Sequence, residues 1–110
     1  MAGKERLTET LNETARNHLS FGRAALARGE ASTAEAAFRG AVEADPDHWY
    51  PLYQLGCLLS DQGRKMDALD QFYRAAAINS DNAALQQAIG TNVVAVGRRP
   101  AAVEAVERAP

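Results

Sequence analysis

Residues 49–82 read WYPLYQLGCLLSDQGRKMDALDQFYRAAAINSDN. Apolar and small residues recur there at steps of three and four on both sides of Gly63, which is typical of two amphipathic helices joined by a turn. The residues expected to point inward are Leu52, Leu55, Leu58 and Leu59 in the first helix and Ala68, Leu69, Phe72, Ala75 and Ala76 in the second. A single hairpin of this kind cannot cover its own apolar face, so the sequence predicts that it stacks on neighbours.

The landmarks of this hairpin return along the chain at a fixed step. A large apolar residue followed by glycine occurs at 21–22, 55–56 and 89–90, a step of 34 residues each time. The same step relates the turn glycines, two sets of alanines and one set of larger apolar residues: Gly29, Gly63 and Gly97; Ala34, Ala68 and Ala102; Ala41, Ala75 and Ala109; Phe38, Phe72 and Val106. A self-similar period of this length predicts a helical repeat array.

Helices are predicted along the whole chain, and no stretch has the strict alternation of a strand. The first helix is expected to begin near Lys4, or at a capping box formed by Thr10 and Glu13, and to end before Gly29. Later helices are expected at about 32–44, 48–62, 65–78, 83–96 and 100–110. We therefore expect an all-α protein.

Capping residues indicate where two of the later helices begin. Ser32 with Glu35 three residues on forms a second capping box. Asp47 is expected to cap the next helix, with Pro51 in its first turn, where a missing amide hydrogen costs little.

Small residues at the repeated positions predict close helix packing. A glycine without a side chain lets two helix axes approach, and this role is expected for Gly22, Gly56 and Gly90. Phe38 and Phe72 are expected to fill the space between neighbouring hairpins.

Composition narrows the class of protein. The net charge is −2, which gives no overall basic field for nucleic acid. The single cysteine, Cys57, excludes an intramolecular disulfide and is compatible with a reducing compartment. The first 15 residues are too polar for a signal peptide, and no apolar run is long enough for a membrane helix. We therefore expect a cytoplasmic protein without membrane or nucleic-acid partners, although the chain could be a piece of something longer.

The pattern resembles the tetratricopeptide repeat, a helix-turn-helix unit with Leu-Gly, aromatic and alanine positions at fixed offsets. The resemblance implies a right-handed superhelical array of antiparallel helix pairs, with about three repeats. The expected divisions are an N-terminal helical extension at 1–14, repeat 1 at 15–48, repeat 2 at 49–82 and an incomplete repeat 3 at 83–110.

The resemblance also implies a function. Members of this family generally act as scaffolds that hold a peptide or helix of another protein in a concave groove lined by the first helix of each pair. Carried over to this chain, that groove is expected to include Arg16, Leu19, Ser20, Arg23, Leu26, Tyr50, Tyr53, Gln54, Cys57, Ser60, Gln87 and Thr91. A known subgroup grips a C-terminal carboxylate with Lys, Asn and Arg, but here the corresponding positions carry Leu19, Arg23, Gln54, Ala84 and Ala88, so that clamp is absent.

Two tyrosines and two arginines carry the most specific binding hypothesis. Tyr50 and Tyr53 share a helix face, while Arg16 and Arg23 can pair with an acidic group, and such residues are enriched in recognition surfaces. They favour a peptide with aromatic or acidic character. The alternative is that the tyrosines complete the packing between repeats and the arginines are solvated.

No catalytic or metal-binding arrangement is visible. Cys57 lies inside a helix without a motif that would activate a thiol, and a partly buried packing role is favoured. His18 occupies a packing position and His48 a loop, without companions at ligand spacing. Arg98 and Arg99 are a weak phosphate signal in an acidic chain. The sequence therefore predicts no enzyme activity, metal or cofactor.

The leading interpretation is a non-catalytic scaffold that binds a protein or peptide, and two alternatives stay open. The first is a homo-oligomeric self-assembly module, because the third pair is cut short and leaves valines uncovered, with contacts expected at Leu7 and Leu11 or at Val103 and Val106. The second is the docking arm of a larger enzyme.

Overall fold

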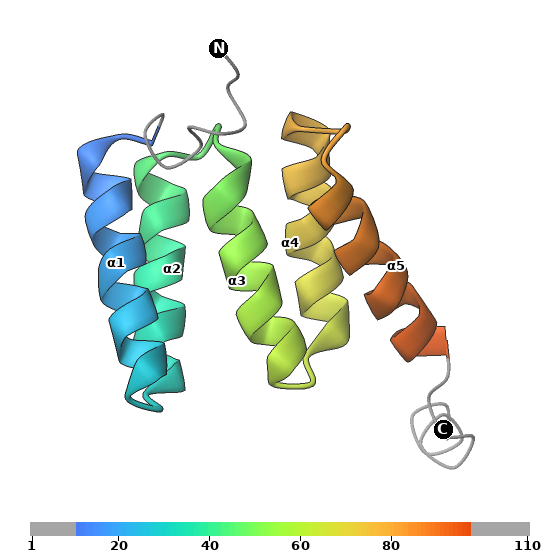
Figure 1. The fold of residues 1–110 in the computed structure, drawn as a ribbon, viewed down its shortest axis with the longest axis horizontal. Coiled ribbons are helices and arrows are strands. Elements are labelled where there is room, and N and C mark those ends of the chain that lie inside the picture. Colours follow the sequence, from blue (N-terminus) through green and yellow to red (C-terminus); the bar gives the residue numbers. More distant parts are fainter. Residues whose placement is uncertain (1–10, 98–110) are drawn as a thin grey trace, which may run out of the picture.

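A computed structural model describes residues 11–97, which contain five α-helices and no strand (Figure 1). The helices are α1 (Glu13–Ala27), α2 (Ala31–Ala44), α3 (Trp49–Asp61), α4 (Lys65–Ile78) and α5 (Ala83–Gly97). They stand side by side in chain order, and neighbours in sequence pack as sequential pairs. The predicted all-α helical repeat fold is confirmed. The predicted helix from Pro100, with Val103 and Val106, lies outside the described residues.

A glycine in the left-handed conformation closes each of the first two pairs. Gly29 has φ +78° and Gly63 has φ +82°, a region that other residues rarely adopt. Beyond Gly29 the amide of Glu30 donates to the carbonyl of Ala25 at 2.9 Å, and beyond Gly63 the amide of Arg64 donates to the carbonyl of Leu59 at the same distance. These bonds satisfy carbonyls at the helix ends, so Gly29 and Gly63 have the turn role that the sequence predicted, whereas Gly97 is the last residue of α5.

The first helix begins later than predicted. Leu11 and Asn12 are not helical, so α1 does not run back through them toward Lys4, and Thr10 is not its cap. Asn12 is the cap, because its side-chain oxygen accepts from the amide of Ala15 at 2.8 Å. Its side-chain nitrogen also donates to the carbonyl of Ala44 at 2.6 Å, which fixes the start of α1 to the end of α2.

Two other predicted caps are also wrong. Ser32 lies inside α2, because the tight turn after Gly29 starts that helix at Ala31 without a side-chain cap. α3 is capped by His48 rather than Asp47, since His48 Nδ1 accepts from the amide of Tyr50 at 3.1 Å. Pro51 lies in the first turn of α3, as predicted.

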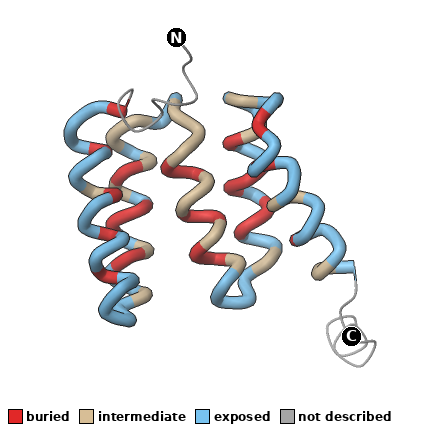
Figure 2. The backbone as a smooth tube through the Cα atoms, in the orientation of Figure 1, coloured by how far each residue is buried: buried red, intermediate tan, exposed pale blue. Residues whose placement is uncertain are grey.

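The core depends on phenylalanine rings that cover glycines. A Cβ placed on Gly22 would lie 2.5 Å from Cε1 of Phe38, and one placed on Gly56 would lie 2.5 Å from Cε1 of Phe72. The rings thus seal the contact within each of these two pairs, whereas the sequence had placed them in the space between neighbouring hairpins. Figure 2 shows the buried residues along the facing sides of α1 to α4, whereas most of α5 is exposed.

A charged cluster links the first two pairs on the surface. Glu35 of α2 accepts from Arg39 at 2.9 Å and from Arg64, in the turn before α4, at 3.0 Å. Hydrogen bonding to Arg39 and then the charge and hydrogen bonding of Arg64 hold the pKa of Glu35 below its ordinary value of 4.5, against the opposing effect of burial. The link joins α2 to the second pair without using core residues.

The glycine contacts predict a specific packing effect. Gly56→Ala should lower the free energy of unfolding by about 1–3 kcal/mol, because the new methyl group overlaps Phe72. The measurement is urea unfolding followed by circular dichroism. Gly90→Ala is the matched control: a Cβ there meets no described atom within 4 Å, so this variant should be neutral or more stable by up to about 1 kcal/mol. Equal effects of the two substitutions would contradict the packing argument.

Candidate functional site

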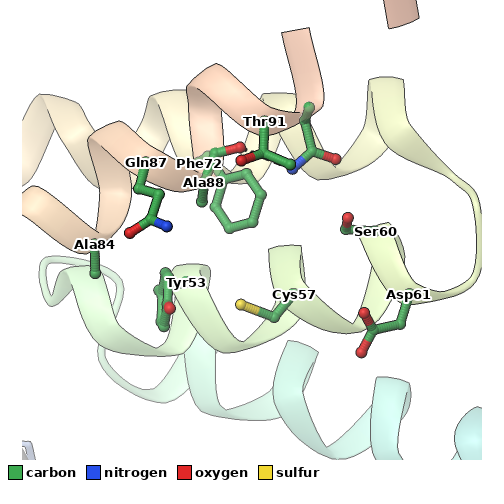
Figure 3. A pocket seen from close by; sticks show the side chains of 10 residues that line it. Tyr53, Cys57, Ser60, Asp61, Phe72, Ala84, Gln87, Ala88 and Thr91 are labelled. Atoms are coloured by element: carbon green, nitrogen blue, oxygen red, sulfur yellow. Dashed lines mark hydrogen bonds between the residues drawn. The ribbon is translucent and has the colours of Figure 1, made fainter. Parts of the chain in front are cut away.

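A hollow of about 310 Å³ opens between α3 and α5 (Figure 3). Phe72 of α4 also lines it, between residues that the other two helices contribute. From α3 come Tyr53, Cys57, Ser60 and Asp61, and from α5 come Ala84, Gln87, Ala88, Thr91 and Asn92. Of the predicted groove residues, Tyr53, Cys57, Ser60, Gln87 and Thr91 are therefore brought together here.

An aromatic cluster stands at the start of α3. The ring centroids of Tyr50 and Tyr53 are 6.4 Å apart, and Trp49 lies 5.5 Å from Tyr50 and 5.8 Å from Tyr53. Tyr53 also contacts Phe72, with a centroid distance of 6.0 Å. All three α3 residues are half-buried, so they both pack and present surface. Trp49 was not among the predicted groove residues, although its spacing to the two tyrosines already placed it beside them.

A second, smaller hollow lies on α1. It has a volume of about 250 Å³ and includes four predicted residues, Arg16, Leu19, Ser20 and Arg23, together with Leu11 and Asn17. Leu19 is 2% exposed and belongs chiefly to the core, whereas both arginines are exposed. Arg16 donates to the carbonyl of Leu11, so part of its role is to hold the segment before α1.

The remaining predicted groove residues lie apart from these two hollows. Tyr50 and Gln54 are half-buried on α3, and Leu26 is exposed near the end of α1. None of the three lines either hollow. The predicted groove is thus two separate depressions with the aromatic cluster of Trp49, Tyr50 and Tyr53 on the helix between α1 and α5.

The sequence did not single out Asp61 of this hollow, nor its buried polar residue, Asn92. It is buried, and its Oδ1 has no hydrogen-bond partner among residues 11–97. The equivalent position one repeat earlier is the apolar Leu58, so a comparison of the repeats could have revealed it as a polar residue at a packing position.

The thiol of Cys57 is protonated at neutral pH. Burial raises its pKa above the ordinary value of 9.0 and outweighs the lowering by hydrogen bonding with Tyr53, while the charge of Asp61 adds a smaller increase. Burial likewise raises the pKa of Tyr53 above 10.0. A thiol in this state is a poor nucleophile, which agrees with a packing role.

The two histidines have structural roles. The ring of His18 lies close to Gly40, since a Cβ placed there would be 3.0 Å from it, and His48 caps α3. Within the part of the chain that the structure describes, no group of His, Cys, Asp or Glu could hold a metal ion. None of its helices is long and apolar enough to cross a membrane.

Cys57 gives a direct chemical prediction. Its alkylation by iodoacetamide should be slower than that of glutathione at pH 7, and the rate should still be rising at pH 9.0, where that of an ordinary thiol begins to level off, because the raised pKa delays full formation of the thiolate. The rate is measured by mass spectrometry across a pH series, with urea-unfolded protein as the control that restores ordinary reactivity. Rapid modification of the folded protein at pH 7 would show that the thiol is activated.

Comparison with known proteins gives a family match in the centre of the chain. A search of curated proteins finds no match. The family model described as tetratricopeptide repeat matches residues 37–70, a window as long as the 34-residue period of the sequence. That window starts within α2, covers α3 and ends within α4. It is offset from the repeat boundaries expected from the sequence, so those boundaries stay a prediction. Residues 37–70 are therefore similar to a tetratricopeptide repeat, in agreement with the repeat pattern of the sequence.

Proposed function

We propose that this protein is a non-catalytic scaffold that binds a peptide or helix of another protein along α1, α3 and α5. The observation that carries the proposal is the hollow between α3 and α5, which gathers residues that the repeat pattern assigns to the groove. Tetratricopeptide repeats in general mediate protein binding, and the matched repeat supplies α3 and part of α4. The repeat divisions at 15–48, 49–82 and 83–110 are part of this proposal.

The surface chemistry supports an extended partner rather than a small molecule. The two hollows are small, about 310 and 250 Å³, and lie on different helices. Between them stands the half-buried cluster of Trp49, Tyr50 and Tyr53, which offers rigid apolar area. Separate side-chain pockets and a central aromatic platform suit a peptide that crosses several helices.

Two charged residues suggest which chemistry the partner has where it meets α1. Arg23 and Arg16 line the hollow on α1, and both are exposed. Guanidinium groups pair with carboxylates through two parallel hydrogen bonds, so an acidic residue of the partner fits there. Arg23 is the stronger candidate, because Arg16 already donates to Leu11.

Peptides selected from a random displayed library test this proposal. Tyr53→Ala combined with Arg23→Glu should weaken binding of the selected peptides at least about tenfold, because truncating buried aromatic and charged contacts typically has this effect. Titration calorimetry gives the affinities, and circular dichroism shows whether helicity is kept. Tyr73→Ala with Arg74→Glu is the matched control, since these residues of α4 line neither hollow.

Two results would contradict the proposal that peptides bind in this groove. One is selected peptides that lose affinity only in the control variant. The other is loss of helicity in the variant of Tyr53 and Arg23, which would make these residues structural.

The outer edge of the first pair supports a second candidate, self-assembly with another copy. Phe21 is 55% exposed, whereas Leu55, one repeat later, is 1% exposed because α2 packs against α3. Phe21 lines an apolar hollow of about 640 Å³ between α1 and α2. Val93 and Val94 of α5 are exposed at the other end of the array, so a second copy could bring the two apolar edges together. Leu11, predicted as a contact, is instead buried in the core.

Phe21→Glu tests self-assembly. If copies associate through this edge, the mass measured by light scattering should rise with concentration in the wild type and stay monomeric in the variant. Met66→Glu is the control, because Met66 is also exposed but lies on α4, away from this edge. A wild-type protein that stays monomeric over a hundredfold range of concentration would reject this candidate.

A further inference from the structure

Asn92 lines the hollow between α3 and α5 and carries an unused hydrogen-bond acceptor. The residue is 3% exposed and lines the hollow. Its Nδ2 donates to the carbonyl of Ala88 at 2.8 Å, while its Oδ1 is buried without a partner among the described residues. The carbonyl oxygen of Ala88 can only accept a hydrogen bond, so the Asn92 atom that faces it must be the nitrogen. The other amide atom, Oδ1, is therefore the unpaired acceptor. An unpaired buried acceptor is costly, and a donor from a bound molecule would remove that cost.

The rest of the hollow is acidic or neutral. Asp61 lines it at the end of α3, and Figure 3 shows Ser60 and Asp61 at one end and Tyr53 and Ala84 at the other. No cation within residues 11–97 forms an ion pair with Asp61. Lys65 follows shortly in sequence, but it donates to the carbonyl and hydroxyl of Ser60 at 2.9 and 3.0 Å and does not line the hollow.

The other walls suit a long aliphatic stem. Tyr53, Phe72, Ala84 and Ala88 supply aromatic rings and methyl groups. The volume of about 310 Å³ is at the lower end for ligand pockets, which fits one large side chain rather than a separate cofactor. The faces of aromatic rings such as those of Tyr53 and Phe72 also attract a cation.

We propose that this hollow receives a lysine or arginine side chain of the bound partner, whose cationic group pairs with Asp61 and donates to Asn92 Oδ1. The inference rests on the proposed function, because it assigns one position of the peptide in the same groove. A lysine ammonium has three donors and no acceptor, so it satisfies both oxygen-bearing groups at once. A carboxylate would be repelled by Asp61, and an apolar side chain would leave Asn92 Oδ1 unpaired.

A small probe tests the hollow without a known partner. N-acetyl-lysine N-methylamide is titrated into the folded protein, and the amide resonances of Cys57 and Thr91 are followed by NMR. The same molecule with norleucine in place of lysine is the comparison, because it has a similar aliphatic stem without the charge. The lysine probe should bind about fivefold to tenfold more tightly, as expected for charge-assisted hydrogen bonds that are partly exposed.

Two variants separate the roles of the anchoring groups. Asp61→Asn should reduce binding of the lysine probe to the level of the norleucine probe. Asn92→Leu should also weaken binding of the lysine probe, yet it should raise Tm, because it replaces an unpaired buried acceptor by apolar atoms. Asp67→Asn is the control, because Asp67 is an exposed acid of α4 that does not line the hollow.

The outcomes are distinct from those of the groove experiment. Equal affinity for the lysine and norleucine probes, unchanged binding in Asp61→Asn, or no saturable shift at Cys57 and Thr91 would each overturn the lysine assignment. If the library yields peptides that need Tyr53 and Arg23 but show no preference for a basic residue, only this inference fails. If the lysine probe binds as expected but no peptide depends on Tyr53 and Arg23, the scaffold proposal fails instead.

Discussion

The contact between a glycine on one helix and a phenylalanine ring on the next sets the spacing of the first two helix pairs. Gly56 and Phe72 are so close that a single added methyl group would overlap the ring, and Gly22 and Phe38 repeat the arrangement. The two phenylalanines are also the largest fully buried side chains. Because the ring occupies the space of the missing side chain, the antiparallel helices approach closely enough to exclude water from their shared face.

The candidate site is a consequence of the same packing. Phe72 is held against Gly56 on one side, meets Tyr53 at a centroid distance of 6.0 Å, and also lines the hollow between α3 and α5. α5 lines the same hollow with Gln87, Thr91 and Asn92. A shift of the phenylalanine ring would therefore alter both the core and the walls of the hollow, so the proposed recognition of a partner would be coupled to stability.

The sequence predicted the repeat and the middle of the fold well, because these depend on local patterns. The range 65–78 of α4 was predicted correctly, since the glycine turn before it and the polar break after it are local signals. Caps were less predictable, because several capping residues stand near each helix start and the turn decides which one is used, as Asn12 and His48 illustrate. The unpaired oxygen of Asn92 depends on which residues α5 packs against, and no local pattern contains that information.

A double-mutant cycle between Gly56 and Phe72 tests the central claim most directly. The free energy of unfolding is measured by urea titration for the wild type, Gly56→Ala, Phe72→Leu and the double variant. If ring and glycine share one space, the smaller leucine relieves the overlap, and the cost of Gly56→Ala should fall by about 1 kcal/mol or more in the Phe72→Leu background. Additive costs, within about 0.5 kcal/mol, would contradict the account by showing that the two residues do not set the helix spacing together.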